Sequence, residues 1–224
     1  TLTLVATVPA TAAGAASHVG VKTCTKCHDV HGESWAATAH AKAFESLQSG
    51  TKAEVKKKAK LDASKDYTKD KDCLGCHSTG FGQPGGYEIG TAPGGAKALG
   101  SVGCESCHGA GGGYRDEHSK AEKKFKKTSE ATPRKTLVAA GQNFDYERAC
   151  ATCHLNYEGS PYKHAKRPYT PFTPAVDPKY RFDFNKAMRS KALHEHYKLK
   201  GVYAGDPVPS MRAEFQKSAK ELPE

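Results

Sequence analysis

The sequence is short of the apolar residues that a self-contained hydrophobic core requires. Only 37% of its 224 residues are hydrophobic, the mean hydropathy is −0.67, and a single Trp accompanies 22 Gly and 12 Pro. No uninterrupted apolar run reaches the ~20 residues of a membrane-spanning helix, so we expect no transmembrane segment. This composition predicts a loop-rich fold with little regular structure, in which bound cofactors supply the missing apolar surface.

Cysteine is absent outside one repeated motif. All 8 Cys belong to four C-x-x-C-H pentads, which leaves none for a disulfide or a free nucleophile. Two thiols at this spacing can add to the two vinyl groups of a haem, and the following histidine supplies the proximal ligand of its iron. Structural zinc sites are the rival interpretation, but zinc gives no reason for a histidine after every second cysteine. The motifs therefore predict four covalently bound haems c, at Cys24-Thr25-Lys26-Cys27-His28, Cys73-Leu74-Gly75-Cys76-His77, Cys104-Glu105-Ser106-Cys107-His108 and Cys150-Ala151-Thr152-Cys153-His154.

The formal charge of +10 is open to two interpretations. A basic surface is typical of nucleic-acid binding, but the chain has no basic motif interleaved with aromatic residues, so we expect no nucleic-acid partner. Four haems bring about eight propionate charges and leave roughly +2, so the lysines neutralise propionates or dock acidic redox proteins. Covalent haem attachment takes place outside the cytoplasm, which predicts an exported protein, periplasmic or extracellular.

The chain divides into three parts by composition. Residues 1–20 form an apolar N-terminal arm, whose alternation over residues 1–8 is typical of an extended strand. Residues 21–205 hold all four pentads and form the tetrahaem domain, and residues 206–224 form a polar, peripheral tail. The arm could be the end of a signal peptide or lie on its own subunit, but we expect it to contact a neighbouring subunit.

The domain is expected to be mainly α, with loops rich in Gly and Pro between short helices. Apolar spacing predicts helices over residues 32–50 and 184–199. We also expect a Lys-rich, solvated helix over residues 51–65 and a short basic helix over residues 114–127.

Seven histidines outside the pentads are candidates for the distal iron ligands: His18, His31, His40, His118, His164, His194 and His196. Methionine is a poor candidate because the chain has only Met188 and Met211. His40, His118 and one of His194 or His196 lie on predicted helices that could pack on a porphyrin, and helical spacing does not choose between the last two. A haem with two histidine ligands transfers electrons, whereas a haem with a vacant face can bind small ligands.

Several runs outside the pentads resemble the tetrahaem cytochrome c-554 family, over residues 21–205. They are Ser34-Trp35, Thr38-Ala39-His40-Ala41-Lys42-Ala43, Ala59-Lys60-Leu61-Asp62, Lys65-Asp66-Tyr67-Thr68, Val102-Gly103 with the third pentad and Gly109, Leu155-Asn156-Tyr157-Glu158-Gly159-Ser160-Pro161, Tyr169-Thr170-Pro171-Phe172-Thr173-Pro174 and His194-Glu195-His196-Tyr197-Lys198-Leu199.

The resemblance implies stacked haem pairs and periplasmic electron transfer from a hydroxylamine-oxidising multihaem enzyme. By position it implies His118 as distal ligand of the first haem, His40 of the third and His194 of the fourth. The second haem, on His77, would be five-coordinate. Its open face would be covered by the loop Thr170-Pro171-Phe172, with nitric oxide reduction as a side activity.

The arm with His18 departs from the family pattern. If it reached a neighbour, His18 of that neighbouring subunit could ligate the iron on His77 and link subunits head to tail into a filament. This arrangement resembles the filament-forming, OmcE-type tetrahaem cytochromes of metal-reducing bacteria. We therefore expect a non-enzymatic electron carrier that assembles into an extracellular conducting filament. The alternative is a monomeric periplasmic shuttle whose haem on His77 reduces nitric oxide or a similar small ligand.

Overall fold

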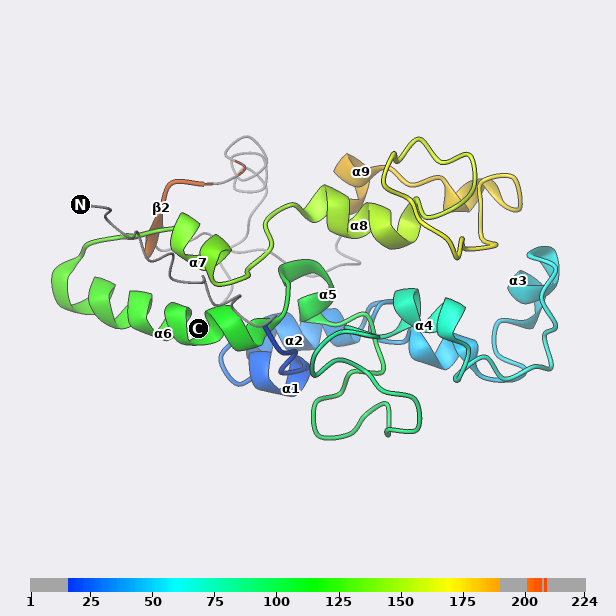
Figure 1. The fold of residues 1–224 in the computed structure, drawn as a ribbon, viewed down its shortest axis with the longest axis horizontal. Helices are drawn as coiled ribbons and strands as arrows, with labels where there is room; N and C mark the ends of the chain where they lie inside the picture. The colour runs from blue at the N-terminus through cyan, green and yellow to red at the C-terminus, as the bar shows by residue number, and fades with distance from the viewer. Residues whose placement is uncertain (1–15, 190–200, 207, 209–224) are drawn as a thin grey trace, which may run out of the picture.

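The computed structural model describes residues 16–189, 201–206 and 208, and within them the chain is mainly helical with long loops (Figure 1). This confirms the expected fold class. The elements are α1 (Val21–Cys24), α2 (Asp29–Ala36), η1 (Phe44–Leu47), α3 (Ala53–Lys58), α4 (Lys71–His77), α5 (Cys104–His108), α6 (Gly111–Thr128), β1 (Thr132–Pro133), α7 (Lys135–Ala139), α8 (Tyr146–His154), η2 (Pro178–Tyr180), α9 (Phe184–Met188) and β2 (Tyr203–Ala204).

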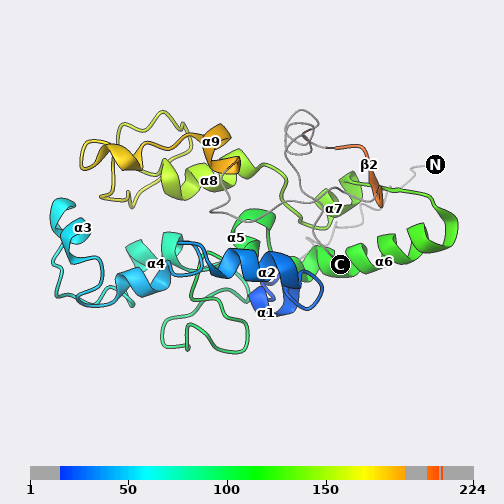
Figure 2. The same ribbon diagram turned by 180° about the vertical axis from the view of Figure 1, so that it is seen from behind.

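The helices form two rows with α5 between them. In the views of Figures 1 and 2, α7, α8 and α9 form one row, and α6, α1, α2 and α4 form the other. Helix α5 packs against α8 of the first row and α1 of the second. None of the helices in the described ranges is long and apolar enough to cross a membrane.

Aspartate side chains cap the N-termini of three of the α-helices. Asp70 accepts a hydrogen bond from the Asp72 backbone N–H at 3.0 Å, and Asp145 accepts one from Arg148 at 3.0 Å. Asp183 begins α9 in the same way. Each carboxylate satisfies an N–H that has no partner within its helix. Two of the three capped helices, α4 and α8, carry pentads, so the caps also fix where the pentads lie.

The apolar core is small and divided. One cluster of buried residues contains Phe44, Leu47, Tyr67, Leu74 and Tyr87, and the other contains Tyr114, Leu137 and Phe144. Clusters of this size leave most of the chain without an apolar interior of its own, as the composition predicted.

Two of the predicted helices are wrong in extent. The helix expected over residues 32–50 ends at Ala36, and the chain then turns before the short η1. In this turn the Thr38 hydroxyl accepts from the Ala41 N–H, and Ser46 of η1 donates its hydroxyl back to the Ala43 carbonyl oxygen. Such local bonds compete with the helical ones. The helix expected over residues 51–65 is reduced to α3.

The other two predicted helices fare better. Helix α6 contains the whole of the range 114–127, which confirms that prediction. Helix α9 begins at the predicted Phe184, and the rest of the range 184–199 lies largely outside the described residues.

The C-terminal end of the arm lies on its own subunit. Glu105, in the third pentad, accepts hydrogen bonds from the Val19 and Gly20 backbone N–H groups at 2.9 and 2.7 Å. The Gly112 N–H donates to the Ser17 carbonyl oxygen at 2.9 Å. Residues 1–15, including the expected strand, lie outside the described residues.

A two-stranded parallel sheet holds the segment 201–206. Thr132 pairs with Tyr203 and Pro133 pairs with Ala204. This pairing brings residues 201–206 back beside α6 and α7, so Tyr203 lies close to the cofactor region.

Candidate haem sites

One cavity connects all four pentads. It has a volume of ≈ 2790 Å³ and a mostly apolar lining, and all the pentad cysteines and histidines line it. A pocket for one drug-sized ligand is about 300–1,000 Å³. The cavity therefore fits several large apolar groups better than one small ligand, and its lining presents the thiols and imidazoles that haem attachment uses.

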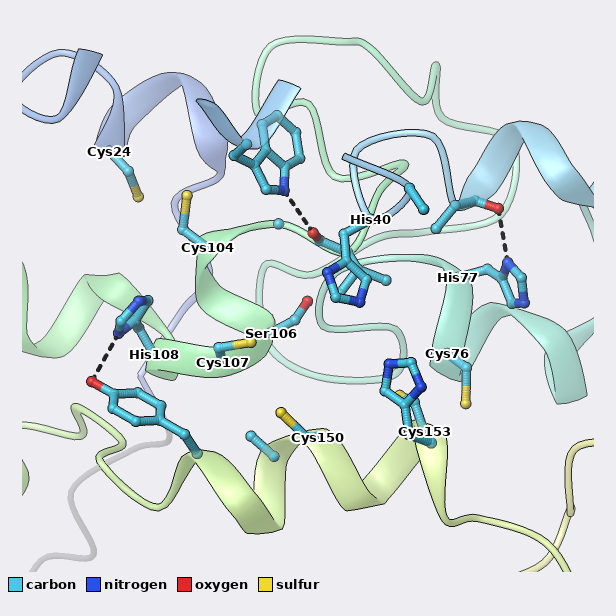
Figure 3. A pocket seen from close by; sticks show the side chains of 18 of the residues that line it. Cys24, His40, Cys76, His77, Cys104, Ser106, Cys107, His108, Cys150 and Cys153 are labelled. Atoms are coloured by element: carbon cyan, nitrogen blue, oxygen red, sulfur yellow. Dashed lines mark hydrogen bonds between the residues drawn. The ribbon is translucent and has the colours of Figure 1, made fainter. Parts of the chain in front are cut away.

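Short helices position the pentads around this cavity (Figure 3). Helices α4, α5 and α8 each end on the histidine of their pentad, and the first pentad runs from the last residue of α1 to the residue before α2. One turn of helix places the two cysteines of a pentad on the same side, with the histidine following at the helix end. The local geometry is thus the same at three of the four sites.

The thiols show which pentads are neighbours. Cys24 of the first pentad lies close to Cys104 of the third, and this contact together with burial raises the pKa of Cys24. Cys76 of the second pentad likewise lies close to Cys153 of the fourth, and this contact together with burial raises the pKa of Cys153. Figure 3 shows Cys24 and Cys104 facing each other.

The third and fourth pentads are also adjacent, because α5 packs against α8. Their cysteines Cys107 and Cys150 lie between these helices in Figure 3, and burial with the nearby Cys107 raises the pKa of Cys150 to about 12. The four pentads thus follow one another in space in the order second, fourth, third, first.

The thiols are free to react with a cofactor. None of the eight cysteines, all of which the structure describes, is in a disulfide. Within the described ranges, no group of three or more His, Cys, Asp or Glu side chains is arranged to hold a metal ion. The arrangement therefore gives no support to paired zinc sites.

The imidazole of His77 is oriented by its neighbours. Its Nδ1 donates to the Ala43 carbonyl oxygen at 2.8 Å and lies 3.1 Å from the Ser46 hydroxyl oxygen. A hydrogen bond at Nδ1 leaves Nε2 free to bind a metal, as second-shell partners of ligating histidines commonly do. Burial lowers the pKa of His77, which favours the neutral ring that binds iron.

His108, the histidine of the third pentad, is contacted by Tyr146. The Tyr146 hydroxyl lies 3.5 Å from Nδ1 of His108, and the two rings meet edge to face with centroids 5.4 Å apart. Tyr146 is the first residue of α8, so this contact adds to the packing of the third pentad against the helix of the fourth.

His40 faces the fourth pentad. Its ring centroid lies 5.9 Å from that of His154. Burial is the main cause that lowers the pKa of His154 to about 4, and the charge of the nearby His40 adds to this effect. Two metal–nitrogen bonds of ~2 Å plus the two rings separate centroids by ~6 Å when imidazoles bind opposite faces of one metal. The family resemblance implied the third haem for His40, and its ring lies beside the histidine of the fourth pentad.

His118 lies beside the first pentad. It lines the cavity from α6. The pKa of His28 is lowered mainly by the burial of His28 and, second, by the charge of the nearby His118. Its Nε2 lies 2.8 Å from the Gln142 side-chain oxygen. The rings of Tyr114 and Tyr203 lie 5.4 and 5.8 Å from it, so the sheet formed by β1 and β2 helps to position this histidine.

His18 is buried inside its own subunit. Only 4% of its surface is exposed, its Nδ1 lies 3.1 Å from the Pro84 carbonyl oxygen, and its ring packs directly against Gly80. It is not among the described residues that line the cavity. In this arrangement its imidazole is directed toward its own chain rather than a neighbour.

The remaining histidines differ in position. His31 lines the cavity edge-on to His28, with ring centroids 5.8 Å apart, and His164 is an exposed residue beside Tyr162. His194 and His196 lie outside the described residues.

The loop Thr170-Pro171-Phe172 lines the cavity that the four pentads share. Asn156 holds this loop: its carbonyl oxygen accepts from the Thr170 N–H at 2.8 Å, and its side chain donates to the Pro168 carbonyl oxygen at 3.0 Å. The Phe172 ring packs against Tyr180 at 5.6 Å. The loop is thus fixed at both ends of the segment that faces the cavity.

Three residues at these sites escaped sequence analysis. Phe182 stacks on the His154 ring at 4.7 Å with 15° between the planes. Asn156 organises the loop described above, and Lys56 is a buried lysine on the cavity wall. Phe182 and Lys56 have no periodic or motif signal, and Asn156 lies in a run that resembles the family without a role assigned to it. The roles of all three depend on contacts with distant parts of the chain. Lys56 stands in a run of three lysines in α3, so the sequence does not show that it is the buried one.

Comparisons with known proteins agree with this geometry. The family described as "Cytochrome c554 and c-prime" matches residues 23–109. Cytochrome c-554 of Nitrosomonas europaea is 55% identical over 202 residues, which are 90% of this chain and 85% of that protein. The solved structure of reduced cytochrome c554 from Nitrosomonas europaea has a TM-score of 0.86 at 54% identity and covers 93% of this chain and 99% of that one. The chain therefore belongs to the cytochrome c-554 family, and it is a multihaem c-type electron carrier with four covalently bound haems c.

Proposed function

We propose that this protein is a monomeric periplasmic electron shuttle that carries electrons along four haems in the order second, fourth, third, first. The observation that supports it best is the single cavity that all four pentads line. Haems held by neighbouring thiols, such as Cys24 beside Cys104, would lie close enough to exchange electrons without a protein barrier between them. Each iron supplies a one-electron ferric–ferrous couple.

Each pentad holds one group in this proposal. The two thiols form thioether bonds, and His28, His77, His108 and His154 provide the proximal nitrogens. The chain orients these nitrogens through contacts such as the Ala43 carbonyl on His77, and it excludes water with rings such as Phe182 on His154.

The distal ligands are assigned by what faces each pentad. His118 serves the first haem, and His40 serves the fourth, since its ring lies 5.9 Å from that of His154. His194, which the resemblance implied for the fourth haem, is then the candidate for the third, with His196 as its alternative. Both lie outside the described residues.

The second haem is the one without a distal histidine in this proposal. Among the residues that the structure describes, no histidine ring is paired with that of His77, and the loop that Asn156 holds lines the cavity. A five-coordinate iron under this loop would bind small ligands such as nitric oxide. Electron transfer remains the main activity, and reduction of such a ligand is a minor one.

The filament reading has less support. It requires His18 of a neighbouring subunit on the iron of His77, but His18 is buried against Gly80 of its own chain. Swinging this residue outward would also break the bonds that Glu105 makes to residues 19 and 20. The observed contacts therefore favour the monomer.

Two measurements on the purified, haem-loaded protein test the proposal. We expect light scattering to give a particle mass equal to that of one haem-loaded chain. We also expect electron paramagnetic resonance of the oxidised protein to show one high-spin ferric signal beside three low-spin ones. Adding nitric oxide to the reduced protein should produce a new ferrous-nitrosyl signal. A polymer with four low-spin haems would overturn the shuttle and restore the filament.

A further inference from the structure

Lys56 is a buried cation beside the second pentad. It lies on α3 with only 4% of its surface exposed, whereas the side chain of the next residue, Lys57, is 63% exposed. Both belong to a run of three lysines, so the sequence does not distinguish them. Burying an ammonium group is unfavourable unless charge or hydrogen bonds compensate for the lost water.

The protein compensates this charge only in part. The Lys56 ammonium donates to the Gln48 carbonyl oxygen at 2.6 Å and lies 5.4 Å from the centre of the Tyr67 ring. Within the described residues no carboxylate forms an ion pair with it. A carbonyl oxygen and an aromatic face are weaker partners than an anion. The exposed Asp66 carboxylate, whose pKa the charge on Lys56 helps to lower, is close enough to interact with it but forms no ion pair. The buried ammonium is therefore only partly compensated by the described chain.

The position of this charge relative to His77 is fixed by η1. Gln48, which binds Lys56, follows η1 directly, and Ala43, which binds the His77 imidazole, precedes it. The side chains of Lys56 and His77 both line the cavity.

We propose that Lys56 is a positioning residue of the electron carrier that raises the reduction potential of the haem on His77 and makes it the preferred site for the electron. A unit positive charge near an iron stabilises its ferrous state over its ferric state, and a propionate of the same haem is the anion that the site lacks. Since the second pentad is at one end of the spatial order of pentads, this charge would hold the electron at that end. The inference rests on the proposed function only for this last point.

The test is a reductive titration of the haem-loaded protein, with the high-spin ferric signal as the readout for the second haem. In Lys56→Met we expect that signal to be lost at a lower potential, by about ten-fold in its ferrous-to-ferric ratio, which is ~59 mV for a one-electron couple. The other three haems should keep their potentials. Lys56→Arg retains the charge and should restore most of the shift.

Lys57→Met is the matched control, because it removes the same charge from the same helix at a solvent-exposed position where water screens it. If Lys56→Met does not assemble four haems, Lys56→Gln serves instead, since its amide can still donate to Gln48. Equal shifts in the Lys56 and Lys57 variants, no shift, or a shift at another haem would overturn the inference. If the protein proves fully low-spin, the proposed function fails, but a single shifted potential among four would still support the role of Lys56.

Discussion

The imidazole of His40 lies 5.9 Å from that of His154, edge to face, across the cofactor cavity. Neither residue is close to the other in the sequence, and no helix holds His40, which lies in the turn between α2 and η1. The turn is fixed instead by backbone bonds, among them Val102 N–H to the His40 carbonyl oxygen at 3.0 Å. The pairing is therefore a property of the tertiary structure.

Replacing His40 tests this pairing. We expect His40→Ala to add one high-spin haem to the ferric spectrum, because the fourth iron loses a ligand. Adding Phe182→Ala should alter the new signal further, since that ring stacks on His154, whereas Tyr146→Phe, beside His108, should not. His164→Ala is the control for an exposed histidine. Sensitivity to Tyr146 in place of Phe182 would assign His40 to the third haem.

The carboxylate of Glu105 is predicted to hold the end of the arm. It is 3% exposed and accepts from three backbone N–H groups, the third being that of Gly111 at 2.6 Å. Glu105→Gln removes the charge and replaces one acceptor oxygen by a donor, so we expect the free energy of unfolding to fall by about 2 kcal/mol. Denaturant titration of the haem-loaded protein measures it, with exposed Glu88→Gln as control. An unchanged midpoint would show that these bonds contribute little.

The loop over the second haem is predicted to limit access of small ligands. Asn156→Ala removes the side-chain bond to the Pro168 carbonyl and the one to the Lys166 N–H, both 3.0 Å, so the loop should open more often. We expect carbon monoxide to bind the reduced protein several-fold faster after flash photolysis. Exposed Asn185→Ala should leave the rate unchanged. Equal rates in both variants would mean that the loop does not control entry.

His18 distinguishes the shuttle from the filament. Because its ring is bonded to Pro84 of its own chain, we expect His18→Ala to leave both the mass of the particle and the spin state of the second haem unchanged. Its effect should be confined to stability. Dissociation of a larger particle, or a new high-spin signal in the variant, would instead support ligation between subunits.

Haem attachment is predicted to drive folding. The buried clusters contain only a few side chains each, such as Leu74 in one and Leu137 in the other, and the large cavity separates the elements that carry them. The chain produced without haem attachment should therefore show little helix by circular dichroism and exchange its amide hydrogens rapidly. A cooperative thermal transition in that apoprotein would contradict this prediction.

Local sequence signals predicted the local features of this protein. The range 114–127 is a continuous helical pattern, and the structure contains all of it in α6. The range 32–50 has a similar pattern but breaks after Ala36, since the Thr38 and Ser46 side chains satisfy backbone groups outside a helix. Helix propensity alone does not distinguish a helix that continues from one that ends early at such side-chain hydrogen bonds.

By itself, the sequence determined the chemistry: the spacing of cysteine and histidine in each pentad is a local property, and it specifies covalent haem whatever surrounds it. Only the tertiary structure decided which pentads are neighbours, which histidine His40 faces, that His18 is directed inward, and that Lys56 alone of three lysines is buried. These features depend on contacts between segments far apart in the chain. Residue spacing carries no information about such contacts, because spacing describes one segment at a time and these contacts join segments on different sides of the cavity.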